Sequence, residues 1–209
     1  MQKTSFGRLP LPLLLLLAPA ALLAAEAKPV AIRLESGRGQ IQFEGKPVQM
    51  GASIPGQGKL STGPDGFAQV RFLPSGTLLN VTPGSTLEIQ PEVVGKPQEL
   101  ALDQGQVRWK IGRKAGPGTA TQWKIRSHSA TMGVRGTDFM AVANPLLAES
   151  EIIVFEGQVD FNSEIDTKDA RKIGAGYWGG VGGRYGQKIG EPIHLPEAAL
   201  KHFDQATKP

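Results

Sequence analysis

Apolar and polar residues alternate with a period of two along much of the chain between Ile32 and Phe161. The alternation is clear at residues 68–72, 107–111 and 139–143. Such short runs indicate strands that bury one face and expose the other. Glycines separate the runs about every ten residues and allow turns between them. The pattern predicts an all-β fold of the sandwich, barrel or solenoid type.

Two turn signals lie between neighbouring predicted strands. One is Pro-Ser-Gly at residues 74–76, and the other is Glu156-Gly157. Proline, serine and glycine favour turn positions, so we expect a hairpin at each site.

The composition changes after residue 164. Residues 174–190 are rich in glycine and carry the aromatic residues Tyr177, Trp178 and Tyr185. Glycine at this density disfavours regular structure, because ordering it costs backbone entropy. Pro196 then suits the start of a helix that we expect to end near Ala206. We therefore assign residues 165–209 as a glycine-rich tail with a short C-terminal helix.

The N-terminus has the three parts of a secretory signal peptide. Lys3 and Arg8 supply positive charge, residues 9–23 are apolar, and Ala25-Glu26-Ala27 offers a small-residue cleavage site. A membrane anchor is the alternative, but prolines interrupt the apolar run and it is short for a span. We expect residues 1–27 to be removed after about Ala27, and the mature protein to be periplasmic in a host with two membranes.

The amino-acid composition further narrows the possible classes of protein and of partner. The chain has no cysteine, which excludes disulfides and a lipid-anchored cysteine. Its formal net charge is +4, and the basic residues are spread along the sequence. Nucleic-acid binding needs a clustered basic stripe, so we expect no nucleic-acid partner. We also expect no integral membrane segment in the mature protein.

An ordered set of motifs runs through the predicted strands. The segments are GPDGFAQVRF (63–72), LPSGTLL (73–79), PGSTLEI (83–89), LALDQGQV (100–107), VRGTDF (134–139) and IVFEGQVDF (153–161). In this order they resemble the FecR domain family, and VRGTDF is the most specific part. The resemblance implies a FecR-like β-domain over residues 28–164, with an all-β, solenoid-like stack of short antiparallel-type strands and hairpins.

The resemblance also implies a kind of function. The best-known members of the family are inner-membrane regulators that control a sigma factor and receive a signal from an outer-membrane TonB-dependent receptor. This sequence has an expected signal peptide instead of a cytoplasmic segment, so it resembles stand-alone exported members. We expect a binding or signalling module whose partner is an envelope protein, either a receptor or a regulator. The alternative is a structural or cell-wall-associated protein that binds glycan.

The sequence offers little that favours catalysis. His128 lies between Ser127 and Ser129, but adjacent residues of a strand point to opposite faces. The three histidines have no metal-ligand spacing, and no phosphate-binding loop is present. We therefore expect no enzyme activity, no cofactor and no metal site.

Candidate binding residues fall in two places. Arg135 and Asp138 lie in the VRGTDF block, where Arg135 could contact a carboxylate of a partner or brace a neighbouring loop. We expect Gly133, Gly136 and Thr137 to form a structural turn there. The second group is Tyr177, Trp178 and Tyr185, which could either contact a partner or hold the tail against the β-domain.

Overall fold

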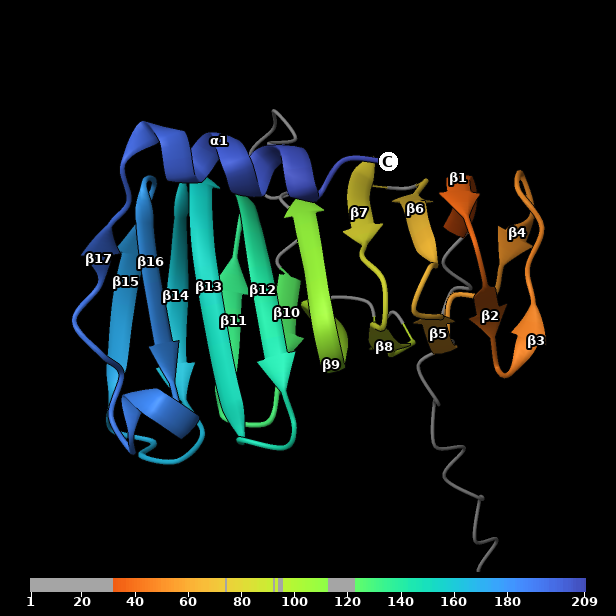
Figure 1. The fold of residues 1–209 in the computed structure, drawn as a ribbon. Coiled ribbons are helices and arrows are strands. Elements are labelled where there is room, and N and C mark those ends of the chain that lie inside the picture. Colours follow the sequence, from red (N-terminus) through yellow and green to blue (C-terminus); the bar gives the residue numbers. More distant parts are fainter. Residues whose placement is uncertain (1–31, 74, 92, 94–95, 113–122) are drawn as a thin grey trace, which may run out of the picture.

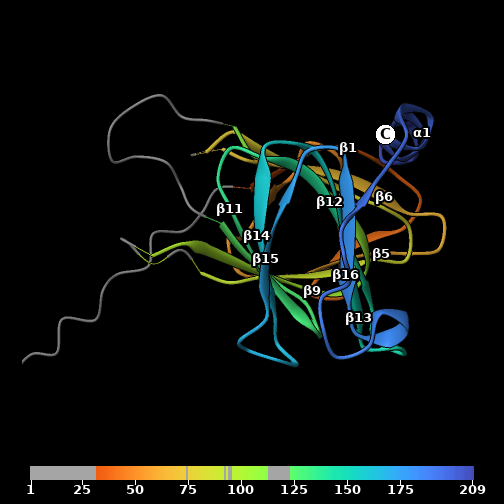
Figure 2. The ribbon, with the colours of Figure 1, turned by 90° about the vertical axis from the view of Figure 1, so that its left-hand side faces the viewer.

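The computed structural model describes residues 32–73, 75–91, 93, 96–112 and 123–209. The strands form two layers that face each other, as the end-on view in Figure 2 shows. We call the layers sheet A and sheet B. The expected signal peptide and Pro74 lie outside the described residues.

Sheet A is the layer on which the C-terminal helix packs (Figure 1). In spatial order its strands are β4 (Ser53–Ile54), β1 (Ile32–Arg38), β6 (Phe67–Phe72), β7 (Thr77–Val81), the second half of β9 (Gln98–Lys110), β12 (Asp138–Asn144), β13 (Glu149–Glu156), β16 (Tyr177–Val181) and β17 (Ile193–His194). All of its pairs are antiparallel.

Sheet B, like sheet A, has strands from the first half of the chain on one side of β9 and strands from the second half on the other. Its strands are β3 (Lys46–Pro47), β2 (Ile41–Phe43), β5 (Gly58–Thr62), β8 (Thr86–Ile89), the first half of β9, β10 (Trp123–Arg126), β11 (Ala130–Val134), β14 (Gln158–Ser163) and β15 (Ala170–Gly174). Its pairs are antiparallel except β9 with β10, which is parallel.

Strand β9 joins the two layers at the middle of the molecule. Its residues 98–104 pair with β8 and β10 in sheet B, and its residues 105–110 pair with β7 and β12 in sheet A. The change occurs at Gly105, whose φ is +88°, a conformation that L side chains rarely adopt. Strands β1–β8 lie on one side of β9, and β10–β17 lie on the other (Figure 1).

The main core fills the space between the two sheets. The inward residues of the alternating runs form it, including Phe72, Trp109, Phe139 and Phe161, all with at most 1% of their surface exposed. The buried positions follow the period-two pattern of the sequence, because successive strand residues point to opposite faces. The alternation thus placed the core correctly.

A second, smaller core lies on the outer face of sheet A. Helix α1 (Glu197–Ala206) covers Met140 and Ile153 with its apolar residues Ala199, Leu200 and Phe203. Helix α1 is the only α-helix among the described residues. No helix in that part of the chain is long and apolar enough to cross a membrane. The outer face of sheet B has no such cover among the described elements (Figure 2).

The all-β prediction is confirmed, and two local expectations are corrected. Gly157 does not close a hairpin: β13 belongs to sheet A and β14 to sheet B, so the chain crosses between the layers there. Residues 174–190 are regular in part, because β15 pairs with β14 and β16 pairs with β13. The boundary expected at residue 164 therefore falls between strands of continuous sheets.

Candidate functional site

The VRGTDF block forms the crossing from β11 in sheet B to β12 in sheet A. Gly136 has a φ of +61°, and the Thr137 hydroxyl donates to the carbonyls of Gln158 (3.1 Å) and Arg135 (3.3 Å). A Cβ on Gly157 would lie 3.1 Å from the Gly136 carbonyl, so the two crossings between the layers pack against each other. Gly133, which we expected in the turn, lies inside β11 instead.

Asp138 is held inside the protein by Arg108 of β9. The Arg108 guanidinium donates two hydrogen bonds to the Asp138 carboxylate, at 2.8 and 3.0 Å. It also donates to the Asp204 carboxylate of α1 at 2.6 Å and to the Thr207 hydroxyl at 3.1 Å. The guanidinium carbon lies 4.0 Å from the ring centroid of Phe155, and the Arg108 side chain is only 4% exposed.

This network fastens the end of α1 to sheet A. Asn80 of β7 donates to the Thr207 carbonyl at 2.8 Å, next to the Arg108 contacts. Hydrogen bonds from Lys208 and Arg108 lower the pKa of Asp204 to about 2. One buried ion pair thus joins two motifs of the sequence: Arg108 directly follows LALDQGQV, and Asp138 belongs to VRGTDF. The side chain of Asp138 is therefore used for contacts within the protein.

Arg135 has the opposite environment. Its side chain is exposed at the end of β11, and it forms no hydrogen bond or ion pair with any residue that the structure describes. No contact among the described residues therefore supports the interpretation of Arg135 as a brace for a neighbouring loop. Its guanidinium is open to solvent beside sheet B.

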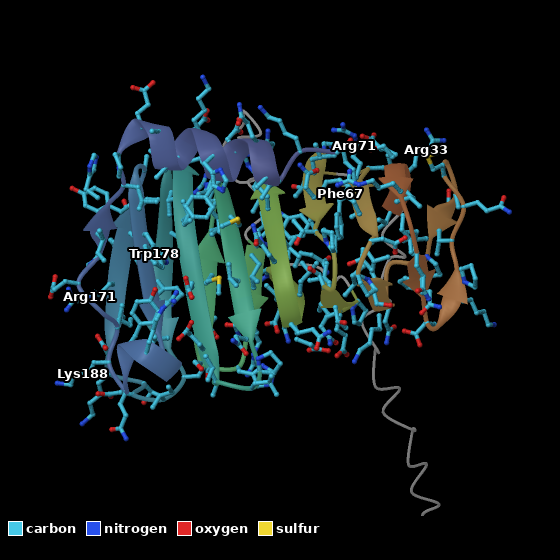
Figure 3. The ribbon with its side chains drawn as sticks, viewed as in Figure 1. Arg33, Phe67, Arg71, Arg171, Trp178 and Lys188 are labelled. Carbon is cyan, nitrogen blue, oxygen red and sulfur yellow. The ribbon has the colours of Figure 1, made fainter. Side chains whose placement is uncertain are left out.

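Of the three aromatic residues of the tail, Tyr177 and Trp178 lie in β16 of sheet A, and Tyr185 lies in the short turn of helix that follows it. Trp178 sits on the outer face of β16 (Figure 3) and donates its indole N–H to Glu151 at 2.9 Å. The Tyr185 ring meets Trp178 edge to face, with centroids 6.3 Å apart. Tyr177 is 39% exposed and contacts His194. Trp178 and Tyr185 therefore help to hold the tail in place.

Beside these rings lies a group that sequence reasoning missed. Glu149 and Glu151 occupy the same face of β13, and Arg184 contacts both, at 3.7 and 2.5 Å. Burial, and then the neighbouring Glu149, raise the pKa of Glu151 to about 7. The spacing of the two glutamates places them on one face, but no signal in the glycine-rich run identified Arg184 as their partner.

An open groove of about 800 Å³ lies on the outer face of sheet B. The strand register sets Lys124, Gly133, Asp160 and Lys172 side by side across β10, β11, β14 and β15. Gly133 has no side chain, so the floor is low at the centre of this row. The complete lining is Pro97, Trp123, Lys124, Thr131, Gly133, Val134, Arg135, Gln158, Asp160, Asn162, Ala170, Arg171 and Lys172.

The serines next to His128 do not act with it. Ser127 donates to the hydroxyl of Ser150 (2.7 Å) and to the Ala130 carbonyl (3.1 Å), while Ser129 contacts the Ala148 carbonyl. His128 is exposed. Within the described ranges no cluster of three histidine or acidic side chains is placed to hold a metal ion.

Comparison with known proteins agrees with this architecture. The family model described as FecR protein matches residues 58–160. Two crystal structures of a candidate anti-sigma factor from Parabacteroides distasonis ATCC 8503 share the fold, with TM-scores of 0.57 and 0.58 and 17% identity. Each comparison covers 70% of this chain and 64% of the other, so this chain spans less than two thirds of that protein's length.

The comparison with curated proteins finds no match. The matched segment begins at β5 and ends within β14, so it contains both the LALDQGQV strand and the VRGTDF crossing. These are the segments that build the Arg108–Asp138 pair and the turn that carries Arg135. The chain therefore carries a domain of the FecR family, over residues 58–160.

Proposed function

We propose that this protein is an exported, non-catalytic binding module of the periplasm that takes part in signalling by contacting another envelope protein. The observation that carries the proposal is the contrast between the two outer faces. Helix α1 packs on the outer face of sheet A, whereas sheet B presents an open groove and the exposed guanidinium of Arg135, which has no ion-pair partner among the described residues. A regulatory domain that works by contact needs such an available surface.

The contacts of the other candidate residues support the same division of roles. Asp138, Trp178 and Tyr185 are engaged in contacts within the chain. Their side chains stabilise the fold and the tail, so we assign partner binding to the side of Arg135. A FecR domain is a regulatory module, which supports a function without catalysis.

Site-directed cross-linking in the native cell envelope tests the proposal. A photo-cross-linking residue replaces Gln158, which is exposed beside the groove, in the tagged full-length gene product expressed in its own host. The matched control carries the same residue in place of Lys201 on the exposed side of α1. We expect a protein adduct from position 158 that is absent from position 201 and is reduced by Arg135→Ala.

Each outcome of this experiment has a definite meaning. Equal adducts from both positions, or none from position 158, would contradict partner binding at sheet B. Recovery of peptidoglycan fragments alone, unchanged by Arg135→Ala, would assign the protein to the cell wall instead. Retention of the protein in the cytoplasm without loss of residues 1–27 would contradict the export part of the proposal.

A further inference from the structure

The groove on sheet B is strongly basic, and the way its charges are paired points to the chemistry of a partner. Its lining contains the basic side chains Lys124, Arg135, Arg171 and Lys172 against one carboxylate, Asp160. An opening with this excess of positive charge raises the local concentration of anions and favours an anionic ligand.

The existing ion pairs leave most of this charge available. Lys172 contacts Asp160 at 2.6 Å, but both side chains are more than half exposed. Lys124 contacts Glu99 at 3.4 Å, and Arg171 contacts Glu191 at 2.8 Å, with the glutamate 83% exposed. Exposed pairs of this kind contribute little, so an incoming carboxylate can replace the partner at small cost. Arg135 pairs with no carboxylate of the described residues, so no such exchange is needed there.

The register of the strands in sheet B sets the distance between the charged side chains of the groove. One outward row holds Lys124, Gly133, Asp160 and Lys172, and the next, two residues along each strand, holds Arg126, Thr131, Asn162 and Ala170. Rows two residues apart are separated by about 7 Å. Alternate side chains of an extended peptide have the same repeat of about 7 Å.

The residues of the lining also favour a peptide over a sugar polymer as the ligand. Protein sites for sugars commonly stack an aromatic face on the ring, and the aromatic side chain of this lining, Trp123, is 2% exposed. The groove instead presents the amides of Gln158 and Asn162 and the hydroxyl of Thr131 beside the cations. Amides and hydroxyls can both donate to and accept from a peptide backbone.

We propose that this groove binds an extended acidic segment of a partner protein, with Arg135 and Lys124 contacting carboxylates that project from one side of the segment. The inference rests on the proposed function, because it names the chemistry of the partner. Arg135 forms the new bidentate contact, since a guanidinium matches the geometry of a carboxylate. The low floor at Gly133 gives the segment room between the flanking side chains.

Fluorescence anisotropy with the purified full-length product tests the chemistry directly. The probe is a fluorescein-labelled peptide of alternating glutamate and threonine, and the control peptide has glutamine at each glutamate. The double variant Lys124→Gln/Arg135→Gln should bind the acidic probe roughly tenfold more weakly than the unmodified protein, as expected for two lost exposed charge contacts. Arg33→Gln, an exposed arginine on sheet A (Figure 3), is the matched control and should bind normally.

The alternatives have distinct signatures. Equal affinity for the glutamate and glutamine peptides, or an unchanged affinity in the double variant, would overturn the proposal. Tighter binding of an oligogalacturonate, lost in the same variant, would overturn it in favour of an anionic glycan. If the peptide fails but the cross-link from position 158 still captures a protein, the acidic chemistry is wrong while the binding function stands.

Discussion

Among the residues that the structure describes, three carboxylates lie largely out of water, and each faces a guanidinium. Asp138 faces Arg108, whereas Glu149 and Glu151 share Arg184. Within sheet A, Arg108 contacts one carboxylate, that of Asp138, through two hydrogen bonds. Arg184, in contrast, is a single cation beside two carboxylates. Burial disfavours the ionised form of Glu151, and the neighbouring Glu149 disfavours it further, so the pKa of Glu151 is raised although Arg184 opposes the shift.

The raised pKa of Glu151 predicts a pH-dependent stability. Its folded-state pKa of about 7 lies above the reference value of 4.5, so its contribution is present below pH 4.5 and is lost as the pH rises towards 7. Glu151→Gln removes the titrating group while keeping an oxygen for the Trp178 N–H. We expect the variant to have a higher Tm than the unmodified protein at pH 8 and a flatter Tm profile between pH 5 and 8.

The control for this profile is Glu156→Gln, on an exposed side chain at the end of the same strand. Thermal unfolding followed by circular dichroism over this pH range checks the expectation. A steep profile that persists in Glu151→Gln would show that another group sets it.

Removing Asp138 should be costly because Arg108 is buried. Asp138→Ala removes the two-point contact and leaves the guanidinium with the Asp204 carboxylate and the Thr207 hydroxyl, and breaking a buried pair typically costs about 3 kcal/mol or more. We expect urea unfolding to show a loss of this size. The matched change Asp160→Ala breaks an exposed pair and should cost less than about 1 kcal/mol. Equal losses in the two variants would contradict the buried role of the Arg108 pair.

At the scale of the elements, β9 and α1 determine which surfaces are available. β9 crosses from sheet B to sheet A, and its Arg108 then reaches both β12 and the end of α1. The helix therefore stays on sheet A and leaves the groove of sheet B uncovered. The division of the molecule into a covered and an open face follows from where this one strand changes layers.

The change of layer depends on Gly105. Its φ is +88°, and an added Cβ would overlap the Ser85 side chain, so Gly105→Ala combines backbone strain with a steric clash. We expect a loss of about 2 kcal/mol or more in urea unfolding. Gly84→Ala is the control, because Gly84 also has a positive φ (+68°) but nothing lies within 4 Å of its Cβ position. A cost for Gly105→Ala no greater than that of the control would show that the clash relaxes freely.

At the scale of the whole molecule, the two sheets share one core and one central strand. We expect the protein to unfold in a single transition. Tryptophan fluorescence reports on β9, β10 and β16, because Trp109, Trp123 and Trp178 lie there, whereas far-UV circular dichroism reports on all strands. Coincident midpoints would confirm the expectation. A circular dichroism transition that precedes the fluorescence change would instead show that β1–β8 unfold separately.

The period-two alternation was enough to predict the strands and the inward residues such as Phe139 and Phe161. It could not assign strands to layers, because a turn at Gly157 has the same local sequence whether it closes a hairpin or crosses between sheets. The motif singled out Arg135 as a candidate, but it did not predict the groove beside Arg135 or the partners of Asp138 and Glu151. Arg108, Asp204 and Arg184 are distant in sequence, and only the three-dimensional packing brings them to these carboxylates.

The central position of β9 also has a consequence for the order of folding. Strands β1–β8 precede it in the sequence, and among the described strands they pair with β9, through β7 and β8, but with no strand that follows β9. While the chain emerges from its N-terminus, β7 and β8 have unpaired edges until residues 98–110 follow. Exposed edges of this kind are where chains aggregate. We expect the nascent chain to depend on a chaperone until β9 has emerged, and to need none once β9 is paired.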